Sequence, residues 1–579
     1  MTINIRRRSA DLTTSQLSDS IPPLLQRIYT ARDIACDEDI ETSLSGLLSP
    51  SQLKGLPEAV TLLADHVVMA KRLLVVGDFD CDGATSSALA VTCLQAMGAG
   101  FVDFLVPNRF DYGYGLTPEI VAVASQQSPD LIITVDNGIS SISGVAAAQQ
   151  AGIKVLVTDH HLPGHELPSA EAIVNPNQPG CEFASKNLAG VGVIFYVMSG
   201  LRAELRRRGW FVERSIAEPN MAEVLDLVAL GTVADVVALD KNNRILVEQG
   251  LRRMRAGRVR PGIKALLEIA NRRMSRLVSA DLGFAAGPRL NAAGRLDDMS
   301  LGIQCLLATD EYQAREMATQ MDELNQDRKS IETSMQREAL QSLEQLDIND
   351  TAEMPWGLCI YQAEWHQGVI GILASRIKDR YHRPVIAFAD SDNGEEIKGS
   401  ARSIQGLHIR DALDAVASKH PGLLSKFGGH AMAAGMSLKK TDYKAFSEAF
   451  DVEVRRQLSA DDLQAVYLSD GGLAAEDFNL PLAQTLRDAG PWGQHFPEPV
   501  FDGEFYLIQQ RIVGEKHLKI VLAPLDNRQQ LIDAIAFNVD IKCWPNAAAE
   551  RVQLVYKLDV NEFRGNQSVQ LLVDQIAVI

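Results

Sequence analysis

Three aspartates lie close together in the stretch VVGDFDCDGA, which spans residues 75–84. Asp78, Asp80 and Asp82 alternate with other residue types directly after an apolar run. Like charges repel, and a carboxylate taken out of water is costly unless it is paired or bound to a metal. No lysine or arginine stands within the motif. The spacing therefore predicts that a bound divalent cation offsets these charges.

Two later stretches add side chains of the same kind. VDNG contains Asp136, and TDHH contains Asp159, His160 and His161. Taken alone, Asp136 could be a turn residue and Asp159 a helix cap. Their joint occurrence after successive apolar runs favours one functional cluster. Carboxylates with imidazole and without thiolate favour Mn²⁺ or Mg²⁺ over zinc, and this many carboxylates can hold two ions.

The elements that must position these residues can be read from the alternation of apolar runs and helix-like segments. Segments of helical length and alanine content lie at 83–98 and 140–152, between apolar runs at 72–78, 101–107, 131–138, 154–161 and 171–176. This pattern predicts an α/β domain with a doubly wound parallel sheet covered on both faces. Ligands bind at the carboxyl ends of such strands, where the polar residues fall. Alternation along an extended segment would turn Cys81 away from Asp80 and Asp82, as an apolar filler.

The rest of the chain predicts three further parts. A polar, Gly- and Pro-free stretch at 310–346 predicts a long amphipathic connector helix. Beyond it we expect a smaller α/β region with a strand at 356–365, a helix at 368–382, a strand at 384–390, and glycine-rich turns at 398–403 and 426–435. Short alternating runs after residue 455 predict a β-barrel, most naturally an OB-fold. The expected domains are 1–50 (N-terminal extension), 51–309, 310–346, 347–455 and 456–579.

Composition narrows the class of protein. The chain has 579 residues and seven scattered cysteines without a CxxC pair, which favours a reducing compartment. The N-terminus lacks the apolar segment of a signal peptide, and no apolar window is long enough to span a bilayer, so we expect a cytoplasmic protein. The net charge of −18 disfavours a general nucleic-acid binder. Residues 201–300 nevertheless carry 18 basic against 12 acidic residues. That stretch predicts either solvated helix faces or a basic lining for a polyanion.

Several long motifs resemble those of the DHH phosphoesterase family. Besides DFDCDG, VDNG and TDHH, the chain contains VPNRFDYGYGL, ALGTVADVVAL, GPRLNAAGRLDDM, EWHQGVIGILASRIK and GGHAMAAG. Their order is similar to that of a bacterial branch of the family, the single-strand-specific 5′→3′ exodeoxyribonucleases of DNA repair and recombination. The resemblance implies a DHH domain, a DHH-associated (DHHA1) domain and an OB-fold. It also implies two-metal hydrolysis of single-stranded DNA to 5′-mononucleotides by a monomer, with single-stranded DNA-binding protein and a RecQ-type helicase as partners.

The resemblance also implies a set of metal ligands. Asp80, Asp82 and His160 match metal-binding residues, and Asp136 matches the carboxylate that bridges the two ions. Asp235, in TVADVV, matches the last ligand, an assignment that rests on the family alone.

This sequence departs from more distant relatives in the residues that bind the first metal ion. They have a histidine where Val76 stands, and Asp78 is our candidate substitute. Asp78 and Asp159 are either ligands or groups that orient His160 and water. His161 is placed to bind the scissile phosphate or a water.

Substrate contacts are expected in both α/β domains. Glycines let a backbone approach phosphate closely, and a neighbouring histidine can donate to it. Basic residues around a serine would form an anion pocket for the 5′ end, and an Arg–Tyr pair could contact the backbone and stack on a base. The residues implied are Arg109, Tyr114, Arg289, Arg295, His366, Ser400, Arg402, Gly428, Gly429 and His430.

Two other functions stay open at the level of sequence. One is a DHH phosphodiesterase for short oligonucleotides or cyclic dinucleotides, whose members resemble only the first two domains. The other is a non-catalytic strand-binding scaffold, against which the intact acidic set argues. A nucleotide-dependent oxidoreductase is disfavoured because the sequence has no GxGxxG turn.

Overall fold

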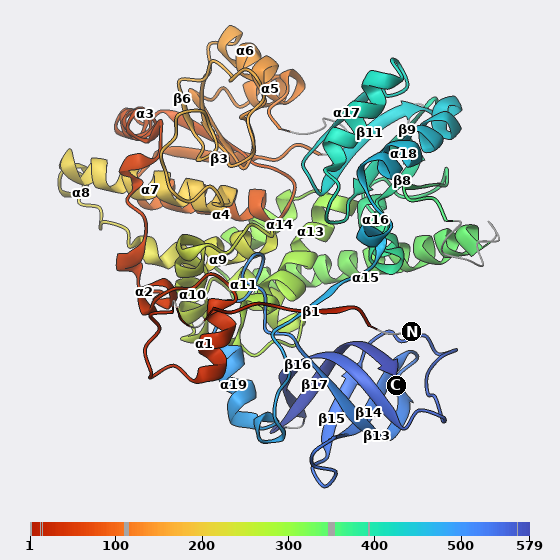
Figure 1. The fold of residues 1–579 in the computed structure, drawn as a ribbon. Helices are drawn as coiled ribbons and strands as arrows, with labels where there is room; N and C mark the ends of the chain where they lie inside the picture. Colours follow the sequence, from red (N-terminus) through yellow and green to blue (C-terminus); the bar gives the residue numbers. More distant parts are fainter. Residues whose placement is uncertain are drawn as a thin grey trace. The chain divides into compact units, whose positions relative to one another are not determined.

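The computed structural model describes residues 3–11, 13, 15–108, 115–344, 354–391, 394–563 and 565–579 (Figure 1). It divides into two compact units. The first combines Met1–Asp322 with Leu468–Ile579, and the second is Glu323–Tyr467. Within the described residues, no helix combines the length and the apolar character needed to cross a bilayer.

The first unit is built on a five-stranded parallel sheet, as the apolar runs predict. Its strands stand in the order β3-β2-β4-β5-β6. They are β2 (Arg72–Val76), β3 (Phe101–Leu105), β4 (Leu131–Val135), β5 (Lys154–Thr158) and β6 (Ala172–Val174). In the order β3-β2-β4, the chain adds β3 on one side of β2 and β4 on the other. The topological switch point therefore lies beside β2, and a ligand crevice forms at such a point in doubly wound sheets.

Helices cover both faces of this sheet (Figure 1). One face packs against α5 (Pro118–Ser125) and α6 (Ile142–Gln150), through a cluster that includes Leu74, Val76 and Val157. The opposite face packs against α4 (Cys81–Ala96) and α7 (Gly190–Arg207). Covered strands have no exposed face, which is why their sequences are almost continuously apolar.

Further helices of this unit surround α4 and α7. The central one is α9 (Leu225–Ala234), which packs on α4, α7 and α10 (Lys241–Arg255). Other helices of this unit include α1 (Pro23–Thr30), α3 (Leu56–Val68), α11 (Pro261–Ile269), α13 (Gly287–Leu296), α14 (Ser300–Leu307) and α19 (Leu480–Asp488).

The segment with the three aspartates differs from the sequence expectation. It is not extended, because α4 already begins at Cys81. Asp80 is the N-cap, and its Oδ1 accepts hydrogen bonds from the backbone N–H groups of Asp82 (2.9 Å) and Gly83 (3.0 Å). Cys81 is buried as expected, but the cause is helix packing rather than strand alternation.

The second unit holds a mixed sheet in the order β10-β11-β9-β8-β7. The long helix α15 (Glu311–Glu344) enters this unit, which confirms the expected connector over the described residues. The strands are β7 (Leu358–Tyr361), β8 (Val385–Asp390), β9 (Glu396–Arg402), β10 (Lys426–Gly429) and β11 (Ala433–Lys439). The helices are α16 (Ile370–Tyr381), α17 (Ile409–Lys419) and α18 (Tyr443–Gln457).

The prediction of a turn was wrong for the first glycine-rich stretch of this unit, which is a strand, and was confirmed only for the centre of the second. Residues 398–402 belong to β9, and only 430–432 turn between β10 and β11. Packing explains at least one of the glycines. A Cβ on Gly399 would lie 2.5 Å from the ring of Phe388 on the neighbouring strand. Glycine therefore makes room for an aromatic side chain, without any turn.

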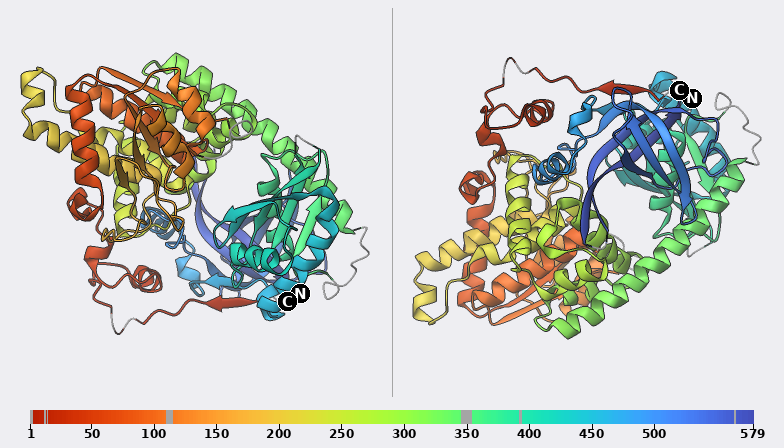
Figure 2. Two further views of the ribbon diagram at one scale, coloured as in Figure 1. Left: turned by 90° about the horizontal axis from the view of Figure 1, so that it is seen from above. Right: turned by 90° about the horizontal axis from the view of Figure 1, so that it is seen from below.

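The C-terminal strands close into a barrel, which confirms the predicted OB-fold (Figure 2). Its order is β13-β14-β15-β17-β16. The strands are β13 (Phe501–Val513), β14 (His517–Pro524), β15 (Ile532–Ala536), β16 (Arg551–Phe563) and β17 (Asn566–Val578). The N-terminal strand β1 (Ile5–Arg7) pairs with β12 (Tyr467–Ser469), which precedes the barrel.

Candidate metal centre

Acidic and imidazole side chains converge at the carboxyl ends of the parallel strands. Asp78 follows β2, Asp136 follows β4, and Asp159 begins the polar triplet after β5. Asp80 and Asp82 lie at the start of α4, and Asp235 is the C-cap of α9. Three sets have ligand atoms within 4.8 Å of one another: Asp78 with Asp80 and Asp136, Asp82 with His160 and Asp235, and Asp136 with His160 and His161.

His160 connects these sets. Its Nε2 lies 3.1 Å from Asp136 Oδ1, 3.5 Å from Asp235 Oδ2 and 3.9 Å from Asp82 Oδ2. Among the described residues, Nε2 of His160 and Oδ2 of Asp235 are buried without a hydrogen-bond partner. Buried polar atoms are almost always hydrogen-bonded, so such atoms facing one another indicate a site built for a ligand.

The electrostatics of the cluster lead to the same conclusion. Burial, together with the charge of Asp235, raises the pKa of Asp82 to about 7. Burial, together with the charge of Asp80, raises the pKa of Asp235 to about 7. The pKa of Asp136 is raised well above its ordinary value for the same reasons. Burial and the charge of His161 lower the pKa of His160. Neutral imidazole among crowded carboxylates fits a hard divalent cation.

Asp159 supports its neighbours through hydrogen bonds. Its Oδ1 accepts from the backbone N–H of His160 (2.7 Å) and His161 (3.1 Å), and its Oδ2 accepts from Ile139 N–H (2.9 Å). Its Oδ1 also lies 2.8 Å from His161 Nδ1. Burial would lower the pKa of His161, but this carboxylate outweighs burial and raises it to about 9. His161 is therefore an imidazolium at neutral pH.

Backbone donors that sequence reasoning missed hold Asp82 in place. The N–H groups of Gly190 (2.6 Å) and Val191 (2.9 Å), at the start of α7, donate to its two oxygens. A Cβ on Gly190 would lie 2.6 Å from Asp136 Cβ, and one on Gly231 would lie 2.9 Å from Asp82 Oδ1. The glycines of AGVG and ALGT were the available signal, since they permit this close approach.

The residues predicted to bind the substrate belong to both units, and two of them lie outside the residues that the structure describes. Arg109 and Tyr114 lie outside the described residues. In the first unit, α13 carries Arg289, whose Nη2 lies 2.8 Å from Asp322 Oδ1, and Arg295. The anion pocket expected from these arginines together with residues of the second unit stays a prediction.

In the second unit, Ser400 and Arg402 share one face of β9. Arg402 Nη1 donates to Ser400 Oγ (3.2 Å), and burial lowers the pKa of the guanidinium. A Cβ on Gly371 of α16 would lie 2.9 Å from both side chains. Gly428 and Gly429 end β10, and His430 follows them in the hairpin turn. His366 Nδ1 accepts from Gly368 N–H (3.1 Å).

The basic stretch of residues 201–300 is largely neutralised within the protein. Arg206 pairs with Glu218, and both Arg252 and Arg255 pair with Glu248. Further pairs join Arg260 to Asp226, Arg272 to Asp281, and Arg273 and Arg276 to Glu562. For most of this stretch, the pairing favours ion-paired helix faces over a continuous lining for a polyanion.

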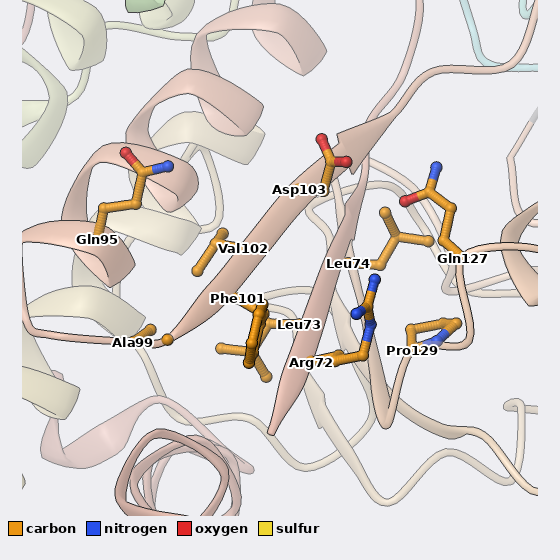
Figure 3. Close-up of a pocket in the computed structure, with 11 residues that line it drawn as sticks. Arg72, Leu73, Leu74, Gln95, Ala99, Phe101, Val102, Asp103, Gln127 and Pro129 are labelled. Atoms are coloured by element: carbon orange, nitrogen blue, oxygen red, sulfur yellow. The ribbon is translucent and has the colours of Figure 1, made fainter. Parts of the chain in front are cut away.

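A cavity of about 270 Å³ lies at the opposite, amino ends of β2 and β3 (Figure 3). The guanidinium of Arg72 lies over the ring of Phe101, with 5.4 Å between Cζ and the ring centroid. The rest of the lining combines apolar side chains with Gln95, Asp103 and Gln127, and Asp103 is its one carboxylate (Figure 3). Because ligands of parallel sheets bind at carboxyl ends, the acidic cluster remains the candidate site.

Comparison with known families matches most of the chain to three domains. Residues 72–232 match the DHH family N-terminal domain, residues 356–456 match the DHHA1 domain, and residues 469–575 match the RecJ OB domain. The first match ends inside α9. It includes every residue of the acidic cluster except Asp235. The third contains the closed barrel.

Individual relatives cover nearly the whole chain. The single-stranded-DNA-specific exonuclease RecJ of Dickeya dadantii is 57% identical over 99% of this chain and 98% of its own length. The enzyme of the same name from Escherichia coli is 56% identical over 99% of both chains. A crystal structure of RecJ in complex with Mn²⁺ from Thermus thermophilus superposes with a TM-score of 0.78 and 28% identity. That superposition covers 96% of this chain and 76% of the other.

Proposed function

The chain belongs to the RecJ family of DHH phosphoesterases, and from that premise we propose that it is a metal-dependent exonuclease of DNA repair and recombination. It degrades single-stranded DNA from the 5′ end and releases 5′-mononucleotides. The observation that carries the proposal is the meeting of Asp82, His160 and Asp235 at the rim of the parallel sheet, where two carboxyl groups have a pKa of about 7.

Two Mn²⁺ or Mg²⁺ ions are the proposed cofactors. Asp78, Asp80, Asp82, Asp136, His160 and Asp235 would hold them. When bound, such ions activate water and offset the charge that develops on a phosphoryl centre. The geometry favours Asp78 as a ligand, because its carboxylate belongs to one of the converging sets. Asp159 acts through its neighbours, since four donors from the chain already engage it.

His161 supplies the protonated donor of the site. With a pKa of about 9, it carries a positive charge at neutral pH. Its Nδ1 lies 2.8 Å from Asp159 Oδ1, and the charged ring is placed to bind the scissile phosphate or a water. Asp159 fixes the orientation of the ring and stabilises its charge.

The second unit is proposed to bind the 5′ end. Ser400 and Arg402 of β9, together with the backbone of Gly428 and Gly429 of β10 and the imidazole of His430, offer donors to a terminal phosphate. Arg289, Arg295, Arg109, Tyr114 and His366 complete the proposed contacts to the strand. Stacking and backbone charge would hold single-stranded DNA with little base preference.

Strands labelled at either end test this function. We expect 5′-labelled single-stranded DNA to lose its label at once as mononucleotide, while 3′-labelled DNA shortens progressively. Chelation should stop both reactions, and Mn²⁺ should restore them. Asp80→Ala and His160→Ala should abolish hydrolysis without unfolding the protein. Full activity in either variant, or in chelator, would contradict the assignment.

The alternative functions predict other outcomes. A phosphodiesterase for short oligonucleotides or cyclic dinucleotides would cleave a dinucleotide and leave a long strand intact. A strand-binding scaffold would bind the strand without cleaving it in Mn²⁺. The closed C-terminal barrel favours a polymer substrate over either small ligand.

Partners and location extend the proposal. We infer a cytoplasmic monomer that works with single-stranded DNA-binding protein and a RecQ-type helicase. Light scattering of the purified chain tests the monomer, and pull-down with each purified partner tests the two associations.

A further inference from the structure

The loop that follows Asp235 is held at three points. Residues 236–240 join α9 to α10, and Val236 has a φ of +62°, unusual for a β-branched residue. Asn243 Nδ2 donates to Ala238 O (2.9 Å) and Arg244 Nη1 donates to Leu239 O (3.0 Å), both from α10. The third hydrogen bond comes from elsewhere, because Leu239 N–H donates to Gln494 O (2.8 Å).

Gln494 belongs to the segment 490–497, which lies between α19 and the barrel and is called the linker here. Reciprocal backbone hydrogen bonds between Gly493 and Phe496 (2.8 and 3.1 Å) close it into a tight turn. The rings of Trp492 and Phe496 stack with centroids 4.9 Å apart. Arg244 joins the two segments, since its Cζ lies 4.5 Å from the centroid of Phe496.

Contact between the linker and the loop is close as well as polar. A Cβ on Gly493 would lie 2.6 Å from Leu239 Cδ1 and 3.1 Å from its Cγ. Leu239 is only 3% exposed, so its side chain has little space into which it could move. The linker is itself fixed, because Arg32 donates to Pro497 O (2.8 Å) and pairs with Asp470. Strand β13 of the barrel begins at Phe501, shortly after Pro497.

We propose that the linker is a positioning element for the metal centre: Gly493 and Phe496, acting through Leu239 and Arg244, set where the Asp235 carboxylate lies. The inference rests on the proposed role of Asp235 as a metal ligand. It assigns to residues outside the DHH domain a part in metal affinity. Groups that orient a ligand without touching the metal alter affinity strongly when they are changed, typically by about 10- to 100-fold.

The direct test is Gly493→Ala in the full-length chain, stripped of metal and free of DNA. Titration with Mn²⁺, followed by the electron paramagnetic resonance signal of the free ion, should show weaker binding by about tenfold. The Mn²⁺ concentration for half-maximal exonuclease activity should rise by a similar factor. The rate at saturating Mn²⁺ should stay within about twofold, because the ligands themselves are unchanged.

Two variants serve as matched controls. Gly472→Ala adds the same methyl group in the same inter-domain region, but its Cβ would meet only Asp502 O at 3.5 Å, an ordinary contact. Glu562→Gln weakens a different attachment of the barrel, to Arg273 and Arg276, which does not involve the loop. Both should bind Mn²⁺ like the wild type.

Rescue separates positioning from general damage. Leu239→Ala removes the atoms that the new methyl group would strike, so the double variant with Gly493→Ala should recover most of the Mn²⁺ affinity. If Gly493→Ala does not fold, Arg244→Lys keeps the charge but loses the hydrogen bond from Nη1 to Leu239 O, and it should also weaken Mn²⁺ binding.

The outcomes distinguish this inference from the proposed function. Wild-type protein that binds no Mn²⁺ would overturn the proposed metal centre. Wild-type protein that binds Mn²⁺, with Gly493→Ala binding it equally well and melting at a lower temperature, would overturn the inference alone and leave the linker as packing.

Discussion

Helix α9 has an acidic side chain near each end, and the two acids have opposite surroundings. At the amino end, Asp226 accepts three hydrogen bonds from Arg260, at distances of 2.9, 3.0 and 3.2 Å, and one from Leu227 N–H. At the carboxyl end, the one basic side chain within 4.0 Å of Asp235 among the described residues is the neutral imidazole of His160. The first acid is paired by the chain itself. The second is left facing other carboxylates.

The helix dipole deepens this difference. A carboxylate is stabilised at a helix N-terminus and destabilised at a C-terminus, where the field favours cations. Asp226 therefore occupies the favourable end and Asp235 the unfavourable one. A half-buried carboxylate that is placed against the field and given no arginine is stable as an anion only when a cation is bound. The contrast teaches that an unpaired buried acid marks a binding site, whereas a paired one marks structure.

The largest expected effect comes from Asp235→Asn. The amide keeps the shape of the carboxyl group but loses the charge that holds the cation, so we expect exonuclease activity to fall by roughly a thousandfold or more, about 4 kcal/mol of transition-state stabilisation. In chelator, the melting temperature should stay the same or rise, because like-charge repulsion is relieved. Thermal melts beside the activity assay check both points. A variant that is active, or that is severely destabilised in chelator, would break the contrast.

Asp226→Asn should do the reverse. It leaves Arg260, whose side chain is only 12% exposed, without its counter-charge. Removing one partner of a buried pair costs about 3–5 kcal/mol in the free energy of unfolding. Denaturant titration in chelator measures that cost. The folded fraction should still bind Mn²⁺, because the change lies about 13 Å of helix rise away from Asp235.

A further effect, of at most about 4 kcal/mol, should appear in the pH dependence of stability without metal. Burial and Asp80 raise the pKa of Asp235 to about 7, far above its value in the unfolded chain. Between about pH 4 and pH 7 the folded state therefore holds a proton that the unfolded state has lost, so the free energy of unfolding falls as pH rises and levels off above 7.

Asp235→Asn removes this contribution. The variant should gain stability relative to wild type at pH 8 and little at pH 5, when both are unfolded by denaturant in chelator. Equal differences at the two pH values would mean that Asp235 is already ionised at pH 5.

Much of the acidic cluster could be predicted from the sequence pattern, but Asp235 could not. Asp136 and the DHH triplet follow apolar strands, and parallel strands bring their carboxyl ends to one edge. Asp235 has no such signal, because it ends a helix within an almost wholly apolar stretch and meets His160 only through the packing of α9. Family resemblance identified it, whereas periodicity could not.

The errors have two physical origins, tertiary packing and a local helix cap. Gly399 was taken for a turn residue although it makes room for Phe388, and Asp80 and Asp82 were taken for an extended segment although Asp80 caps a helix that begins at Cys81. The backbone donors of Gly190 and Val191 carry no side-chain signal at all. Local patterns specify which elements form, while these contacts depend on neighbours that are distant in sequence.

The smallest expected effect tests whether burial, rather than pairing itself, gives the Asp226–Arg260 pair its importance. Arg206 and Glu218 form the same kind of pair, but their side chains are 54% and 34% exposed. Arg206→Gln should therefore leave the free energy of unfolding almost unchanged, since exposed pairs are screened by water and salt. Denaturant titration at low and high salt measures this change. Because Glu218 already engages Arg206, the salt dependence of strand binding should also be unchanged. A loss as large as that of Asp226→Asn would show that pairing matters regardless of burial, and the two ends of α9 would then need another explanation.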